Sequence, residues 1–212
     1  MVQYTLWETT VDIQIPKTVF PTKDEIKIID DILGVPCKHG YFKSPHHGKN
    51  LHYRRFIPSD DDDIPIKGIF LFQHGIKAEG GMACKMHNGE VYKMAVLSQM
   101  LTKAGYIFYT LDMLGHGFSE GERFYIPDAN WTINRDDLAS FALFVSDQEK
   151  NIQNTNNNNQ QLPFFLGGES YGACLTLHVA RKWMDQPNDC PSNFKGICIA
   201  APGKFYFCDR SI

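Results

Sequence analysis

An α/β fold built on a mostly parallel sheet is the architecture that this sequence predicts, and two observations support it. Four short runs are apolar along their whole length, as strands buried on both faces of a parallel sheet tend to be. They span residues 67–73, 106–113, 163–169 and 194–202. Segments with the apolar spacing of helices separate these runs, so strands and helices alternate along the chain. This alternation predicts helices on both faces of the sheet.

The three helical segments follow the first, second and third strands. They span residues 90–105, 133–150 and 170–183. The first segment places Met94, Leu97 and Leu101 on one face and ends at Gly105. The second has four apolar residues on one face, namely Leu138, Phe141, Ala142 and Val145. These two segments therefore have apolar stripes that can cover the sheet.

A β-hairpin is predicted in front of the parallel strands. Residues 39–45 and 50–57 are short alternating runs, and the turn-rich stretch HHGKN joins them. The chain length favours one main domain. We therefore assign the hairpin and all four parallel strands to a single unit, residues 37–212.

Residues 1–36 are predicted to be an extension with one short helix. Thr22 and Glu25 form a capping box, apolar residues follow at helical spacing, and Gly34 ends the pattern. The extension stands outside the alternating part of the chain.

Two polar stretches are predicted to be loops. The four aspartates at 60–63 are interpreted as a solvated turn, because adjacent carboxylates cannot all converge on one metal ion. Residues 151–161 are a low-complexity tract rich in asparagine and glutamine, which cannot contribute to a core. We expect this tract to be a disordered loop that bulges out from the domain.

Composition and charge exclude several classes of protein. The net charge of −3 and the lack of a basic helix face give no reason to expect nucleic acid as a partner. The first twenty residues lack the basic start and apolar core of a signal peptide, and no apolar stretch is long enough to span a membrane. The six cysteines form no C-x-x-C pair, and we expect Cys174 and Cys198 to be small core residues. A reducing, cytoplasmic location fits these features.

The stretch GGESYG at 167–172 contains the pattern G-x-S-x-G around Ser170. In this motif a sharp turn from strand to helix exposes the serine hydroxyl at the edge of the sheet. A predicted strand precedes the motif here and a predicted helix follows it, as the turn requires. Ser170 is therefore the candidate nucleophile. The alternative is a structural serine that is buried or caps the helix.

Two backbone N–H groups are candidates for an oxyanion hole. One belongs to Tyr171, the residue after the candidate nucleophile, and the other to Ile76, in the loop after the first parallel strand. The glycine-rich stretch LDMLGHGFSEGER follows the second parallel strand and predicts a tight loop. We interpret Asp112 and His116 as residues that hold this loop, with direct catalysis as the alternative.

From about residue 40 to 203 the chain resembles the α/β-hydrolase superfamily, and within it the monoacylglycerol lipase and lysophospholipase group of the serine aminopeptidase type. The stretches QHG, LDMLGHGFSEGER and GGESYG are similar to motifs of that group. After His74 the chain differs, because IKAEGGMACKMHNG is longer than the usual loop. The resemblance places Ser170 on the nucleophile, Ile76 and Tyr171 on the oxyanion donors, and His74 on a loop histidine that is not the triad base.

The resemblance implies a serine hydrolase that cleaves carboxylic esters, of the monoacylglycerol or lysophospholipid type, with lipid-like or aromatic substrates. It implies no cofactor and no metal ion. Nucleic acid and a transmembrane segment are not expected, whereas peripheral contact with a membrane is compatible with lipid-like substrates.

The triad acid and base are not found in this chain. In this fold the order is serine, acid, histidine, and the only histidine after Ser170 is His178. It lies eight residues into the helix, about 12 Å along the axis, which is too far to accept the serine proton. The aspartates at 185, 189 and 209 are poor matches for the acid. We therefore expect a C-terminally truncated hydrolase without the cap and last strands, inactive alone: a gene-model fragment, a splice product or half of a split sequence.

Two other functions remain as alternatives. A non-catalytic binding protein would use the α/β-hydrolase cleft without chemistry. A metal-dependent hydrolase would use the eight histidines, but no cluster with ligand spacing supports it.

Overall fold

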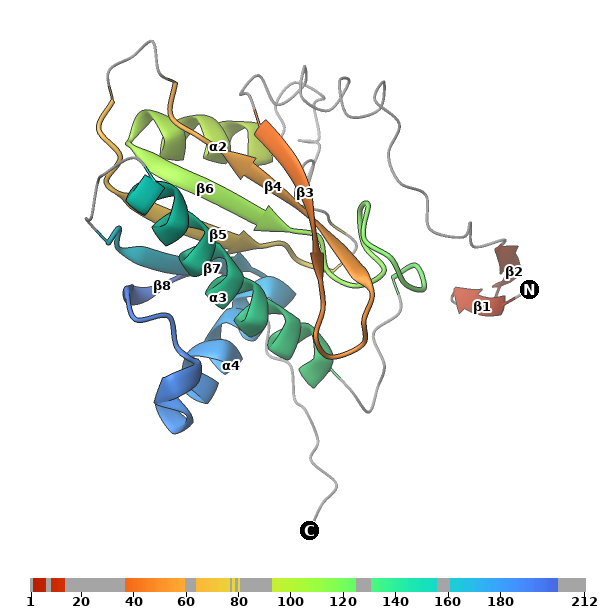
Figure 1. Ribbon diagram of the computed structural model, residues 1–212. Helices are drawn as coiled ribbons and strands as arrows, with labels where there is room; N and C mark the ends of the chain where they lie inside the picture. The colour runs from red at the N-terminus through yellow and green to blue at the C-terminus, as the bar shows by residue number, and fades with distance from the viewer. Residues whose placement is uncertain are drawn as a thin grey trace.

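The computed structural model describes residues 2–6, 9–13, 37–59, 64–76, 78, 80, 93–124, 131–155 and 161–201. Figure 1 shows a twisted sheet with helices packed on both of its faces. The helix expected after Thr22 and the aspartate block at 60–63 lie outside the described residues.

Six strands form the main sheet in the order β3-β4-β6-β5-β7-β8. Their bounds are β3 Cys37–Lys43, β4 Asn50–Phe56, β5 Gly68–Gln73, β6 Tyr106–Leu111, β7 Phe164–Glu169 and β8 Phe194–Ala200. The pairs β5–β6, β5–β7 and β7–β8 are parallel, and β3–β4 and β4–β6 are antiparallel. The predicted hairpin and the four predicted parallel strands are therefore confirmed.

In the described part of the chain, three α-helices cover the sheet: α2 (Lys93–Lys103), α3 (Thr132–Thr155) and α4 (Tyr171–Asp185). A short 3-10 helix, η2 (Pro187–Asp189), follows α4. Successive residues of β6 point to opposite faces of the sheet. Ile107 and Tyr109 belong to the large core beneath α3 and α4, whereas Phe108 packs with Met94 of α2. The mixed α/β sheet with helices on both faces is thus confirmed (Figure 1).

Three expectations need correction. The polar tract is not a loop from its start, because α3 continues through residues 151–155 and buries Gln153; each further residue of an established helix adds a hydrogen bond. The extension contains an antiparallel strand pair, β1 (Val2–Leu6) with β2 (Thr9–Ile13), that was not predicted. Cys174 is buried as expected, but Cys198 is exposed because β8 lies at the edge of the sheet.

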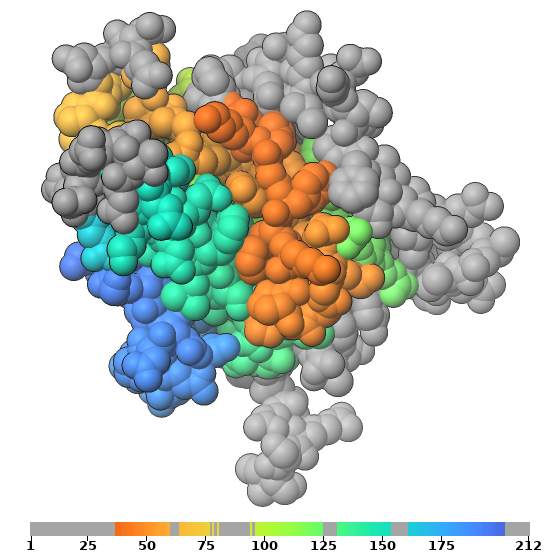
Figure 2. Space-filling model, in the orientation of Figure 1, coloured from red at the N-terminus to blue at the C-terminus, as the bar shows by residue number. Residues whose placement is uncertain are grey.

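A buried ion pair joins the hairpin to α3. The guanidinium of Arg55 donates from Nε to Oε1 of Glu149 at 2.6 Å and from Nη2 to Oε2 at 2.9 Å. The hydroxyl of Tyr109 donates to the same carboxylate. The hairpin and α3 lie next to each other on the face shown in Figure 2, in orange and teal.

We predict that the 212-residue polypeptide aggregates through the edge strand β8. Ile197 and Cys198 of this strand are exposed, and Lys195 is a charged residue near its start. An exposed apolar edge offers unpaired backbone groups to other chains. We expect Ile197→Lys to reduce aggregation, as measured on a sizing column, and Leu177→Lys, at an exposed apolar position on α4, to leave it unchanged. A wild-type chain that stays monomeric would contradict this expectation.

Candidate active site

Ser170 lies at a sharp turn between β7 and α4. Its backbone has φ of 54° and ψ of −119°, a conformation that non-glycine residues rarely adopt. The N–H of Ser170 donates to the carbonyl of Ala200 at 3.0 Å, which ties the turn to the end of β8. The strained backbone is held between two strands and a helix, as the G-x-S-x-G motif requires.

The glycines of the motif allow this turn to pack closely. A Cβ atom at Gly168 would lie 2.3 Å from the carbonyl oxygen of Gly172. A Cβ atom at Gly172 would lie 2.2 Å from the carbonyl oxygen of Gln73, at the end of β5. Any side chain at either position would therefore push the turn away from β5 and from the loop that follows it.

The hydroxyl of Ser170 has no hydrogen-bond partner among the described residues. The side chain is exposed, so Ser170 is not a core residue. It makes no capping hydrogen bond to α4, although it occupies the N-cap position. The two structural alternatives for this serine, burial and helix capping, therefore disagree with its geometry.

The loop after β5 lies directly against Ser170. A Cβ atom at Gly75 would be 3.2 Å from the Cβ of Ser170. The carbonyl oxygen of Gly75 accepts hydrogen bonds from His74 Nδ1 at 2.8 Å and from the N–H of Ala78 at 3.3 Å. In a trans peptide the next N–H, that of Ile76, points the opposite way from this carbonyl. The structure records no hydrogen-bond partner for the Ile76 N–H among the described residues.

His74 fixes this loop through both of its ring nitrogens. The N–H of Met113 donates to Nε2 at 3.0 Å, so the proton of the neutral ring is on Nδ1, which donates to Gly75. The ring is fully buried, and burial lowers its pKa to about 4. His74 is thus neutral and bonded at both ring nitrogens, which agrees with a loop histidine that is not the triad base.

Because His74 is buried, we predict that the folded protein loses stability in mild acid. The folded state takes up this proton only near pH 4, whereas the unfolded chain takes it up near pH 6.5. Stability should therefore fall as the pH drops through this range, by at most about 3 kcal/mol from this residue. In urea titrations between pH 7 and pH 4, His74→Gln should show a shallower loss than wild type. His46→Gln, at an exposed position, should keep the wild-type loss. Equal slopes in all three proteins would contradict the prediction.

Asp112 is a buried junction between β4, the tight loop after β6 and the segment at residue 80. Its carboxylate accepts from the N–H of Gly80 at 2.5 Å and of Phe118 at 3.1 Å. His52 Nδ1 lies 2.9 Å and Arg54 Nη1 3.3 Å from it. Burial opposes ionisation, but Arg54 and His52 outweigh it and hold the pKa of Asp112 well below its usual range. This geometry agrees with the predicted structural role.

His116 also holds the tight loop. Its Nδ1 donates to the carbonyl of Leu114 at 3.0 Å, and its ring lies 5.3 Å from that of His74. It is buried, and burial lowers its pKa. His116 and His74 therefore pack the loop after β6 against the loop after β5.

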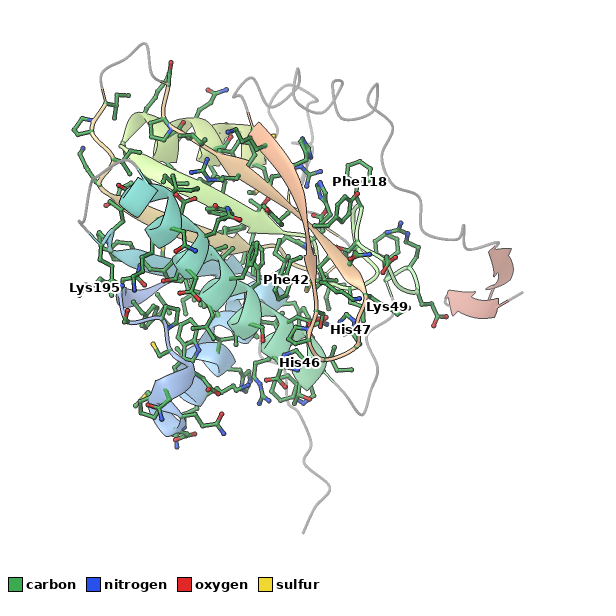
Figure 3. The ribbon with its side chains drawn as sticks, in the orientation of Figure 1. Phe42, His46, His47, Lys49, Phe118 and Lys195 are labelled. Atoms are coloured by element: carbon green, nitrogen blue, oxygen red, sulfur yellow. The ribbon has the colours of Figure 1, made fainter. Side chains whose placement is uncertain are left out.

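No histidine of the described part of the chain hydrogen-bonds to the Ser170 hydroxyl. His178 packs its ring against Trp131, with centroids 4.5 Å apart. His46 and His47, at the β3–β4 turn, bond to Ser140 and Asp137 of α3 (Figure 3). His87 and Asp209 lie outside the described residues, and Asp185 and Asp189 are exposed near the end of α4.

Sequence reasoning missed the partners of Asp112. The β4 segment HYRRF contains a histidine and two arginines within a strand that is otherwise apolar. Charged residues in a buried strand require partners, so this segment was a signal for an acidic residue nearby. His52, Arg54 and Gly80 form that environment around Asp112.

The residues that the structure describes contain no helix long and apolar enough to cross a membrane. Within the same residues, no group of three or more histidine, cysteine or acidic side chains is placed to hold a metal ion.

The model of the serine aminopeptidase S33 family matches residues 86–205, more than half of the chain. This span includes the tight loop after β6 and the turn at Ser170.

The curated proteins that are similar to parts of the chain include a lipase and an esterase. Monoglyceride lipase of Rattus norvegicus is 27% identical over 106 residues, which are 50% of this chain and 29% of that protein. Caffeoylshikimate esterase of Arabidopsis thaliana is 29% identical over 170 residues, 80% of this chain and 42% of that protein. The chain thus spans less than half the length of either relative.

Solved structures with the same fold include an α/β serine hydrolase without lid from Xanthomonas campestris, with 16% identity and a TM-score of 0.51 over 82% of this chain and 65% of that one. The esterase LipW from Mycobacterium marinum gives 11% identity and a TM-score of 0.51 over 84% of this chain and 47% of that one. Both likenesses support the α/β-hydrolase fold.

Proposed function

The chain belongs to the serine aminopeptidase S33 family and has the α/β-hydrolase fold, and we propose that it is the nucleophile-bearing part of a serine hydrolase that cleaves carboxylic esters. The observation that carries this proposal is the backbone of Ser170. It adopts a rare conformation at a strand-to-helix turn and leaves an exposed hydroxyl without a structural partner among the described residues.

In the proposed reaction the Oγ of Ser170 attacks the ester carbonyl while a general base takes the hydroxyl proton. The negative charge that develops on the carbonyl oxygen is stabilised by the N–H groups of Ile76 and Tyr171. The N-terminus of α4 adds a favourable dipole at the same place. Loss of the alcohol leaves an acyl ester on Ser170, which water then hydrolyses.

Support for Ile76 as a donor comes from its position. Gly75 lies against Ser170, and the two hydrogen bonds to its carbonyl fix the peptide that carries the Ile76 N–H. Support for Tyr171 comes from its place as the first residue of α4, directly after Ser170. The Asn134 amide lies 3.4 Å from the Tyr171 hydroxyl and anchors its side chain on α3.

The acid and the base of the triad are proposed to lie outside the described residues. The family order puts them after the serine. His178, the histidine of α4, is held against the ring of Trp131. The 212-residue polypeptide alone is therefore proposed to be inactive.

The proposed substrates are monoacylglycerol- or lysophospholipid-type esters, or esters of aromatic acids. This class is supported by the relatives that are named monoglyceride lipase and caffeoylshikimate esterase. Among the described residues, the cysteines at 37, 174, 190 and 198 form no disulfide, which supports a reducing, cytoplasmic setting. The alternative is a non-catalytic α/β-hydrolase-like protein that binds such esters.

The test uses the chain extended by the acid- and histidine-bearing strands of the family. Turnover of monoacylglycerol, lysophospholipid and p-nitrophenyl esters should be lost in Ser170→Ala and kept in Ser192→Ala, a matched change at an exposed serine. Ester binding without turnover in the wild type, unaffected by Ser170→Ala, would favour the binding protein and overturn the enzyme.

A further inference from the structure

A chain of four side chains connects the edge of the sheet to its interior, away from Ser170. Cys37 Sγ lies 3.3 Å from Nε2 of His39, on the same strand β3. Nδ1 of His39 lies 2.9 Å from Nε2 of His52 on β4, and Nδ1 of His52 lies 2.9 Å from the carboxylate of Asp112. The relay, as we call these four residues, joins a thiol, two imidazoles and a carboxylate.

The protons of the two inner contacts of the relay can be placed by starting from its buried end. Asp112 is ionised, because it accepts hydrogen bonds from two backbone N–H groups and faces Arg54. His52 therefore donates from Nδ1. Burial lowers the pKa of His52, which keeps it neutral, so its Nε2 is an acceptor. His39 then donates from Nδ1 to His52, and its Nε2 faces the thiol of Cys37.

Burial differs along the relay in a way that favours thiol chemistry. His52 and Asp112 are fully buried, whereas Cys37 and His39 are half-buried. The rings of Phe118 and Tyr41 pack on His52, with centroids at 5.2 and 5.4 Å; Phe118 is labelled in Figure 3. The inner end is thus shielded from solvent, whereas the outer end is partly accessible.

We propose that Cys37 is an activated thiol and the preferred site of modification by soft electrophiles, with His39 as its base. The thiol proton passes to Nε2 of His39, and the resulting imidazolium is stabilised by His52, which Asp112 holds in the accepting tautomer. The sulfur then forms a bond to the electrophilic atom, whose leaving group departs with the bonding electrons. An imidazole next to a thiol is what raises the thiolate fraction in reactive cysteines.

The other cysteines of the described part of the chain lack this arrangement. Cys174 is buried, and burial raises the pKa of Cys190. Cys198 is the matched control, because it is more exposed than Cys37 and its thiol has no recorded hydrogen bond among the described residues. Exposure alone predicts that Cys198 reacts first. The relay predicts that Cys37 does.

The experiment is competitive alkylation of the folded 212-residue chain with iodoacetamide, with each cysteine quantified by mass spectrometry of its peptide. In this reaction the sulfur–carbon bond forms, iodide leaves and the proton remains on His39. At pH 6 an ordinary thiol is only roughly 0.3% ionised, whereas a thiol paired with imidazole keeps its thiolate. The ratio of Cys37 to Cys198 modification should therefore rise at least about fivefold from pH 8 to pH 6.

His39→Gln tests whether His39 activates Cys37, because the substitution removes the proposed base at a half-buried position. In this variant Cys37 should lose the pH-dependent advantage, while Cys198 should react as in wild type. Circular dichroism checks that the variant is folded. In a control in urea, where the chain is unfolded, all the thiols should react alike. Faster reaction of Cys198 at every pH in the wild type would overturn the proposal, even if the variant does not fold. So would an unchanged Cys37 rate in a folded His39→Gln chain.

Discussion

A polypeptide limited to residues 1–212 should turn over p-nitrophenyl esters on the order of 10⁶ times more slowly than the same chain extended by the acid- and histidine-bearing strands. A serine hydroxyl is a weak nucleophile until a base takes its proton. His74 is bonded at both ring nitrogens, and His178 is held against Trp131, so neither can serve Ser170. What remains is the contribution of the oxyanion donors and of binding.

The comparison needs a control for folding, because a shortened chain can lose activity by unfolding. Circular dichroism and a urea titration of both chains supply it. Ser170→Ala should abolish turnover in the extended chain and change little in the short one. Comparable turnover in both folded chains would show that a base within residues 1–212 reaches Ser170.

The second large effect concerns stability. Asp112→Ala should destabilise the fold by about 3–5 kcal/mol, because it breaks a buried ion pair with Arg54. His52 and the N–H groups of Gly80 and Phe118 lose their acceptor at the same time. Such a loss is a large part of the stability of a typical domain, so unfolded or aggregated protein is an expected outcome.

Asp136→Asn is the matched control for Asp112→Ala. The Asp136 carboxylate binds Lys182 and Arg135, with about a fifth of its side chain exposed. A pair of this kind contributes at most about 1 kcal/mol. Urea titrations at neutral pH should therefore separate the two variants clearly. An Asp112→Ala protein with the wild-type midpoint would show that the junction at Asp112 does not stabilise the fold.

The strands could be predicted from the sequence because their apolar runs are local. The run at 163–169 and the following helix gave the turn at Ser170, and the structure has β7 and α4 there. The exposure of Cys198 could not be predicted, because an apolar run does not say whether a strand is central or at an edge. The end of α3 was missed because the polar composition of residues 151–155 does not reveal a helix that continues from a well-packed one.

The site could be predicted only as far as single residues. Ser170 and the loop role of Asp112 followed from motifs, but the partners of Asp112 depend on which residues of β4 lie opposite which residues of the neighbouring strands. The register pairs Tyr41 with His52 and His39 with Arg54, which puts all four on one face. Such cross-strand contacts are tertiary, and a one-residue change of register would have removed them.

The claim that Ser170 is a nucleophile whose base lies outside the described residues is tested most directly by labelling with a fluorophosphonate probe. The rate is measured in the short and the extended chain, and the labelled residue is identified by peptide mapping. We predict slow labelling of the short chain and fast labelling of the extended chain, in both cases on Ser170. Fast labelling of the short chain, or a label on another residue, would contradict the account.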